Sequence, residues 1–81
     1  MQSSDTPAQD WDRHEILAQV RRRGLTLSKL SRRAGWQPNT LNAALERPWP
    51  KGEKIIADAL GLTVEDIWPS RVERRRQRAA A

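Results

Sequence analysis

Glycine and proline divide this chain into short segments, and no other feature constrains the fold as strongly. Both residues favour turns and helix ends over helix interiors. The dividing residues are Gly24, Gly35, Pro38, Pro48, Pro50, Gly52, Gly61 and Pro69. The segments between them suit short helices, and none alternates apolar and polar residues as a half-buried strand would. The sequence therefore predicts an all-α fold.

Apolar spacing and capping residues predict five helices. Their expected ranges are residues 12–22, 27–34, 38–47, 51–60 and 64–68. Pro38 is expected at the first position of the third helix, where a missing N–H is harmless. Thr63 and Asp66 have the spacing of a capping box. Pro69 is expected to end the fifth helix. Five short helices would form one compact domain.

The composition excludes several classes of protein. The 81 residues contain no cysteine and one histidine, so disulfides and zinc sites with sulfur ligands are impossible. No apolar run approaches the length of a membrane helix, and the polar segment 1–9 lacks the pattern of a secretory signal. We therefore expect a cytoplasmic, nucleoid-associated bacterial protein with no metal, cofactor, catalytic residue or small-molecule substrate.

Positive charge is concentrated in two parts of the chain, although the net charge is only +5. Nine lysines or arginines against two glutamates give residues 21–54 a balance of +7, and five arginines against one glutamate give residues 71–81 a balance of +4. Such clustering favours a polyanionic partner such as nucleic acid. We expect a disordered segment at 1–9, a DNA-binding domain at 10–71 and a basic tail at 72–81, either a nascent helix or a flexible arm.

The segment 27–45, LSKLSRRAGWQPNTLNAAL, has the organisation of a helix-turn-helix. Gly35 can adopt the left-handed conformation that turns the second helix across the first. Ser31 stands where this motif usually has alanine, but it is small enough for close approach. Apolar residues fall where the two helices would touch, namely Leu30, Ala34, Trp36, Leu41, Ala44 and Leu45.

The second helix of such a motif presents its N-terminal residues to base edges in the major groove. Amide side chains can bond to adenine, and methyl groups can contact thymine. The candidates for base contact are Gln37, Asn39, Thr40, Asn42 and Ala43. The candidates for phosphate contact are Ser28, Lys29, Arg32, Arg33, Arg47, Lys51 and Lys54. One helix reads only a few base pairs, so we expect a dimer on paired half-sites of double-stranded DNA.

Several strings are typical of one family. ALERPWPKGEKIIADALG at 44–61, DIWPSR at 66–71, LSKLSR at 27–32 and DW at 10–11 resemble the Ner-like DNA-binding regulators of phages and bacteria. The resemblance covers residues 10–71. It implies a compact five-helix domain similar to the lambda repressor-like class, which binds operator DNA and represses transcription. By motif position, Ser28 to Ala34 resemble the positioning helix and Pro38 to Arg47 the recognition helix.

Two other functions stay open from the sequence alone. A nonspecific, nucleoid-type DNA binder would use the basic face without distinguishing bases, and a helical adaptor would bind an acidic protein. Tryptophans among basic residues could also stack on single-stranded bases. Three of the four tryptophans flank helix ends, where we expect them to pack in the core. Trp49, near Arg47 and Lys51, is the candidate exception.

Overall fold

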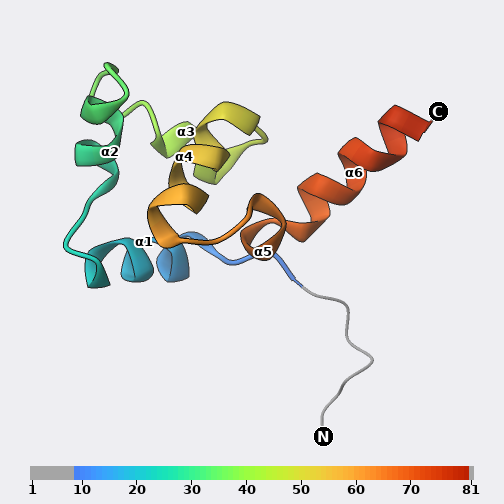
Figure 1. The fold of residues 1–81 in the computed structure, drawn as a ribbon, viewed down its shortest axis with the longest axis horizontal. Coiled ribbons are helices and arrows are strands. Elements are labelled where there is room, and N and C mark those ends of the chain that lie inside the picture. The colour runs from blue at the N-terminus through green and yellow to red at the C-terminus, as the bar shows by residue number, and fades with distance from the viewer. Residues whose placement is uncertain (1–8, 81) are drawn as a thin grey trace, which may run out of the picture.

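The computed structural model describes residues 9–80, and within that range it contains six α-helices and no strand (Figure 1). The helices are α1 (Arg13–Arg22), α2 (Leu27–Arg33), α3 (Asn42–Glu46), α4 (Pro50–Leu60), α5 (Val64–Ile67) and α6 (Pro69–Ala80). The all-α prediction is confirmed, whereas the predicted count of five helices is wrong. The predicted disordered segment lies outside the described residues, apart from Gln9.

Local capping bonds start several helices where the sequence predicts. The Asp12 carboxylate accepts a hydrogen bond from the Glu15 N–H at 2.8 Å, ahead of α1. Thr63 and Asp66 form the predicted capping box ahead of α5, with each side chain accepting the other's backbone N–H. The Thr63 backbone and hydroxyl hold the pKa of Asp66 below its ordinary value, because their hydrogen bonds favour the carboxylate. These boundaries depend only on neighbouring residues.

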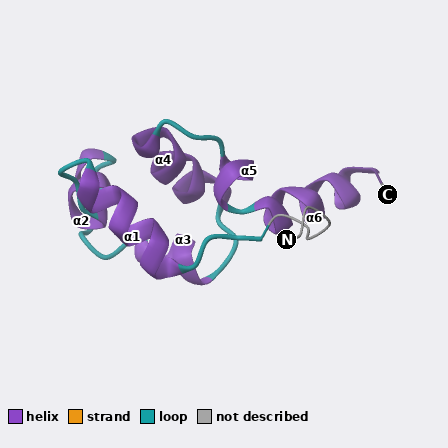
Figure 2. Cartoon of the chain, turned by 90° about the horizontal axis from the view of Figure 1, so that it is seen from below, coloured by secondary structure: helices purple, strands orange, loops and turns teal. Residues whose placement is uncertain are grey.

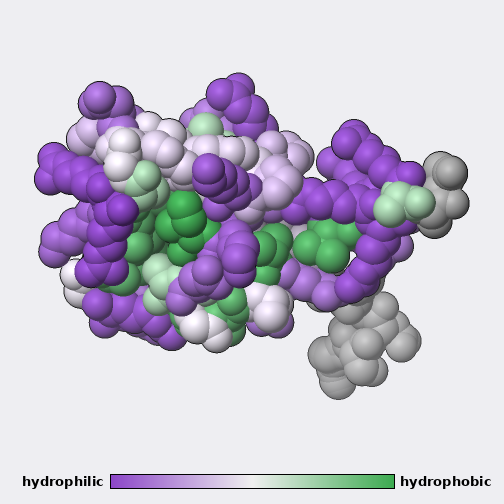
Figure 3. All heavy atoms as spheres, turned by 45° about the horizontal axis from the view of Figure 1, so that its top comes forward, coloured by the Kyte–Doolittle hydropathy of each residue, from purple (hydrophilic) through white to green (hydrophobic). Residues whose placement is uncertain are grey.

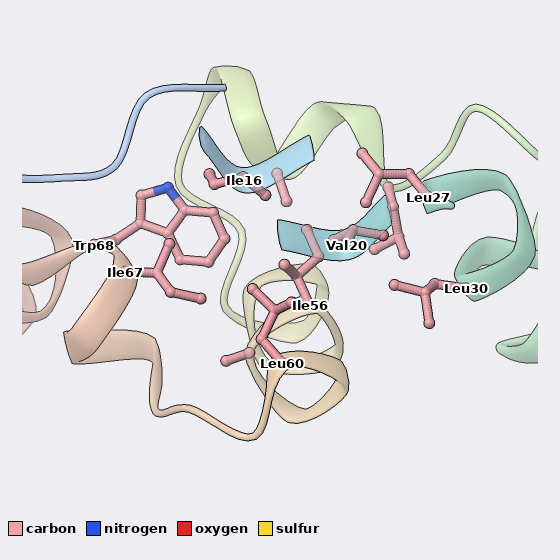
Figure 4. Close-up of a cluster of buried hydrophobic side chains, with 11 residues drawn as sticks. Ile16, Val20, Leu27, Leu30, Ile56, Leu60, Ile67 and Trp68 are labelled. Carbon is pink, nitrogen blue, oxygen red and sulfur yellow. The ribbon is translucent and has the colours of Figure 1, made fainter. Parts of the chain in front are cut away.

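Helix α4 lies at the centre of the fold and packs against α1, α2, α3 and α5. The side chains shown in Figure 4 come from helices along the whole chain and converge on α4. The buried apolar residues are Ile16, Val20, Leu27, Leu30, Leu41, Ala44, Ile56, Ala57, Leu60, Ile67 and Trp68. Full burial of a leucine or isoleucine side chain contributes about 1.5–3 kcal/mol to stability. This single cluster therefore fixes how α2 and α3 are placed.

The third helix begins later than predicted. The expected range was 38–47, but the α-helix starts at Asn42. The reason is a tertiary hydrogen bond, since the Leu41 N–H donates to the Ser31 hydroxyl at 3.1 Å and not to the Gln37 carbonyl one turn back. Around Leu41, successive i→i−3 bonds of 3.0–3.3 Å wind the chain as a tight 3₁₀-like turn. Pro38 therefore opens this turn and is not the first residue of an α-helix.

Two prolines explain two further differences in helix boundaries. Arg47 was expected in the third helix, but it is extended, with φ −152° and ψ 160°. A residue that precedes a proline, here Pro48, disfavours the helical conformation. Pro69 was expected only as a stop, but it is the first residue of α6. A helix tolerates proline there because the first turn needs no donated N–H.

Helix α6 settles the open choice for the basic tail, because residues 69–80 are helical. The Asp10 carboxylate caps its first turn, accepting hydrogen bonds from the Ser70 N–H at 2.9 Å and from the Ser70 hydroxyl at 2.6 Å. The Trp11 N–H also donates to the Ile67 carbonyl at 2.9 Å. The start of the domain is thus bonded to the α5–α6 junction. Figure 2 shows α6 projecting from that junction, away from the other helices.

A buried ion-pair cluster fixes α6 against α4. The carboxylate of Glu53 is fully buried and accepts hydrogen bonds from Arg75 at 2.8 and 3.0 Å, from Arg71 at 3.0 Å and from the Trp49 N–H at 2.6 Å. Burial opposes the charge, but the bonds from Arg75, Trp49 and Arg71 outweigh it and hold the pKa of Glu53 below its ordinary value. Arg71 also donates to the Ala44 carbonyl of α3 at 2.6 Å. The base of α6 is therefore part of the packed domain.

Candidate nucleic-acid interface

Helices α2 and α3 form the predicted helix-turn-helix pair. Gly35 has the expected left-handed conformation, with φ 82°. The Trp36 N–H then donates to the Ser31 carbonyl at 2.9 Å, which closes the turn onto α2. Ala34 was expected where the two helices touch, but its side chain is exposed beside the turn. The contact between the two helices is instead made farther along the chain, by residues around Leu41.

Ser31 connects the two helices through a polar bond as well as through close packing. Its side chain is fully buried, and its hydroxyl is the acceptor for the Leu41 N–H. A buried N–H without an acceptor is costly in free energy, so this bond fixes the position of the turn before α3 relative to α2. An alanine at this position would allow the same close approach but would accept no hydrogen bond. By fixing Leu41, the serine also fixes which side of the domain the residues on either side of Leu41 face.

We expect Ser31→Ala to lower the free energy of unfolding by about 1–3 kcal/mol, because it leaves the buried Leu41 N–H without its acceptor. Urea denaturation measures the loss, and hydrogen exchange at the Leu41 amide should become faster. Ser28→Ala, on the same helix but half-exposed, is the control and should change stability by less than about 0.5 kcal/mol. Equal effects of the two variants would show that the Ser31 hydroxyl does not position the turn.

The candidates for base contact lie together on the turn and on the first residues of α3. They alternate with the fully buried Leu41 and Ala44, so the segment has one inner and one outer side. Three outer amide side chains are exposed and two smaller outer side chains are half-buried, in order Gln37, Asn39 and Asn42, then Thr40 and Ala43. The amides carry both donors and acceptors. This surface can form the paired hydrogen bonds that distinguish an adenine edge.

The candidates for phosphate contact surround that segment but differ in their partners. Ser28 is half-buried, and the remaining members are exposed, namely Lys29, Arg32, Arg33, Arg47, Lys51 and Lys54. Lys29 donates from Nζ to the Gly24 carbonyl at 3.4 Å. Lys54 forms an ion pair with Asp58 at 3.5 Å. Lys51 has no carboxylate partner within the described chain and lies over the ring of Trp36.

A pair of tryptophans packs beneath Lys51, one of the candidates for phosphate contact. The rings of Trp36 and Trp49 pack at a centroid distance of 5.0 Å, tilted by 32°, and the Lys51 ammonium lies 5.7 Å from the Trp36 ring. Gly52 has no side chain where the Trp49 ring sits, and a β-carbon there would lie 2.4 Å from the ring. Both rings are half-buried. Packing between them explains the tryptophans better than stacking on single-stranded bases.

The sequence analysis missed a second basic feature, an arginine-lined crevice beside α6. Its volume is about 70 Å³, and its lining residues are Pro48, Arg71, Arg74, Arg75 and Arg78. The signal was present, because positions separated by three, four and seven residues share one face of a helix. Because the sequence leaves open whether the basic tail is helical, it does not assign these arginines to one face. The sequence analysis also missed the buried Glu53, to which two of these arginines bind.

Residues 10–81 match one protein family. A family model described as winged helix-turn-helix DNA-binding covers residues 10–81. The chain belongs to this family. Between residues 9 and 80, this winged helix-turn-helix protein has no strand, so that part of the chain contains no β-structured wing. None of the helices in the same range is long and apolar enough to cross a membrane.

Similar proteins include a negative regulator of transcription and a DNA-binding protein Ner. The chain is 53% identical over 70 residues to a negative regulator of transcription from Escherichia phage Mu, covering 86% of this chain and 93% of the phage protein. It is 37% identical over 73 residues to the Mu-like prophage FluMu DNA-binding protein Ner of Haemophilus influenzae, covering 90% and 82%. The solution structure of the Mu Ner protein superimposes with a TM-score of 0.69 at 54% identity, covering 85% and 93%. The predicted resemblance is confirmed.

Proposed function

We propose that this chain is a sequence-specific, double-stranded DNA-binding repressor of transcription, with a domain of the lambda repressor-like class. One observation carries the proposal, namely the outer row of exposed amides at Gln37, Asn39 and Asn42 on the second element of a helix-turn-helix. In this motif that element enters the major groove. The surrounding lysines and arginines supply the sequence-independent attraction to phosphates.

Repression as the direction of regulation rests on the relatives. The similar proteins of Escherichia phages Mu and D108 are both named negative regulators of transcription. A DNA-binding domain can repress by occupying a promoter. We therefore assign the chain to repression.

The proposal includes two subunits on paired half-sites. The outer residues span only positions 37–43, so one copy contacts a short stretch of groove. Each correct base pair adds about 1–3 kcal/mol of discrimination, and a genome offers about 10⁶–10⁹ competing sites. One copy cannot supply that selectivity, whereas two copies one helical turn apart can. Gln37, Asn39, Thr40, Asn42 and Ala43 are the proposed base-contacting set.

Selection of bound duplexes from a random pool at physiological salt tests the proposal. We expect a short motif that recurs as two half-sites about 10 base pairs apart, centre to centre. A pool that binds without enrichment would contradict sequence specificity and favour a nucleoid-type DNA binder. A chain that retains no duplex would favour the adaptor for an acidic protein. The enriched motif would also supply the operator for measurements on variants.

We expect Lys51→Ala to weaken binding to selected and random duplexes by the same factor, because a phosphate contact carries no sequence information. The plot of log affinity against log salt concentration has a negative slope, and loss of one phosphate contact reduces the magnitude of this slope by about 0.9. Titrations at several salt concentrations measure this slope. Arg13→Ala, on α1 outside the helix-turn-helix, is the control and should leave the slope nearly unchanged. Equal slopes for wild type and Lys51→Ala would remove Lys51 from the phosphate-contacting set.

A further inference from the structure

Helix α6 carries a stripe of arginines that the helix-turn-helix does not use. We call Arg71, Arg74, Arg75 and Arg78 the α6 stripe, since their spacing puts them on one face of the helix. On the opposite face of α6, the arginine is paired with carboxylates. There Arg76 binds the Glu65 carboxylate with two hydrogen bonds of 3.0 and 3.1 Å and lies 3.8 Å from Glu73. Positive charge on α6 is thus neutralised on one side and accumulated on the other.

The inner half of the α6 stripe anchors the helix, and the outer half has no such role. Arg71 and Arg75 bind the single buried carboxylate of Glu53, and their side chains are 10% and 33% exposed. Arg74 and Arg78 are exposed, and neither forms an ion pair within the described part of the chain. Four guanidinium groups against one carboxylate leave the stripe with a balance of +3. The anchor holds the helix that carries the outer pair against α4.

The α6 stripe lies next to the C-terminal end of α3. Arg71 donates to the Ala44 carbonyl in α3, and Pro48, the second residue after α3, lines the crevice together with the stripe. From that point α6 leads away from the body of the domain, as Figure 1 shows, and hydrophilic side chains cover much of it in Figure 3. The stripe therefore extends the basic surface from the C-terminal end of α3 outward along α6.

We propose that Arg74 and Arg78 bind backbone phosphates of double-stranded DNA beside the segment contacted by α3, which extends the footprint beyond the helix-turn-helix. This inference rests on the proposed function. Guanidinium groups pair with phosphate through planar, bidentate hydrogen bonds. The two side chains stand one helical turn apart, about 6 Å along the axis. Each DNA strand carries one phosphate charge for every 3.4 Å or so of duplex axis, so two long side chains at this spacing can reach two phosphates.

The test compares the salt dependence of DNA binding for two variants with the same loss of charge. Arg74→Gln with Arg78→Gln removes the outer half of the α6 stripe. Arg13→Gln with Arg76→Gln removes two exposed arginines elsewhere. The probes are the selected operator and a random duplex of equal length. We expect the first variant to reduce the magnitude of the slope of log affinity against log salt concentration by about 1.8. Its loss of affinity between 50 and 200 mM salt would then be about 12-fold smaller than that of wild type. The second variant should keep the wild-type slope.

Further variants and outcomes keep this inference separate from the proposed function. Arg74→Lys with Arg78→Lys keeps the charge and should retain the slope, and an unchanged thermal melt shows that each variant is folded. A wild type that selects an operator while the stripe variant keeps its full slope would overturn the inference alone. Equal losses in the two glutamine variants would also overturn it, since they would reflect net charge. A wild type that bound neither duplex would overturn both proposals.

Discussion

Glu53→Gln should lower the free energy of unfolding by about 3 kcal/mol and the melting temperature by about 12 °C or more. Removing one member of a buried ion pair leaves the opposite charge uncompensated. Here the carboxylate is 0% exposed and two guanidinium groups depend on it. Partial exposure of Arg75 limits the cost to the lower end of the usual range. Urea and thermal denaturation of the two proteins measure the difference.

Glu65→Gln is a matched control for this prediction. Glu65 also accepts two hydrogen bonds from one arginine, Arg76, but both side chains are at least half exposed. Exposed ion pairs contribute about 1 kcal/mol or less. The same substitution with the same type of partner therefore isolates the effect of burial. If the two variants lost equal stability, the cluster around Glu53 would not be what holds α6 to α4.

The lowered pKa of Glu53 also predicts a response to acid. Since its pKa in the folded protein lies below the ordinary value of 4.5, the ionised carboxylate is favoured by folding. Its contribution is complete above pH 4.5 and is lost as the pH falls through the folded-state pKa. Wild type should therefore lose more stability than Glu53→Gln on acidification below pH 4.5. Parallel curves for the two proteins would contradict this assignment.

The double variant Asn39→Ala with Asn42→Ala should lose its preference for the selected operator over random DNA by about 30-fold or more. Each paired contact between an amide and an adenine contributes about 1–3 kcal/mol of discrimination, and every 1.4 kcal/mol is a factor of ten. Affinity for random duplex should change little, because the basic residues are untouched. Competition binding with both duplexes measures the ratio.

Gln19→Ala with Gln77→Ala removes two amides from α1 and α6 and serves as the control for that experiment. It should keep the full preference for the operator. A uniform loss of affinity for both duplexes in the asparagine variant would show that these residues only hold the fold or contact phosphates. In that case Gln37 would be left as the one amide of the outer row to supply base discrimination.

The parts of the fold that the sequence predicts are those encoded by near neighbours. The Thr63–Asp66 capping box joins residues three apart, and the left-handed turn at Gly35 follows from one residue type. Such signals can be recognised without knowing the tertiary structure. They were enough to place the helix-turn-helix and the outer row of amides, which together define the candidate site.

The parts that the sequence does not predict depend on bonds between distant residues. The late start of α3 follows from Ser31 binding the N–H of Leu41, ten residues later. The docking of α6 follows from Glu53 binding arginines 18 and 22 residues later. A glutamate on a helix is ordinarily assigned to the surface, so only the packed structure reveals that this one is buried. The arginine stripe is different, because its spacing is visible in the sequence and only the helical state of the tail was left open.

Bonds between the two ends of the domain have a consequence for its synthesis. The Trp11 N–H and the Asp10 carboxylate find their partners, Ile67 and Ser70, only after nearly the whole domain has been made. Glu53 would likewise be buried without a counter-charge in a chain that stops before Arg71. We therefore expect the domain to complete its folding only after α6 leaves the ribosome, and a shortened nascent chain to expose its apolar helices to chaperones and proteases.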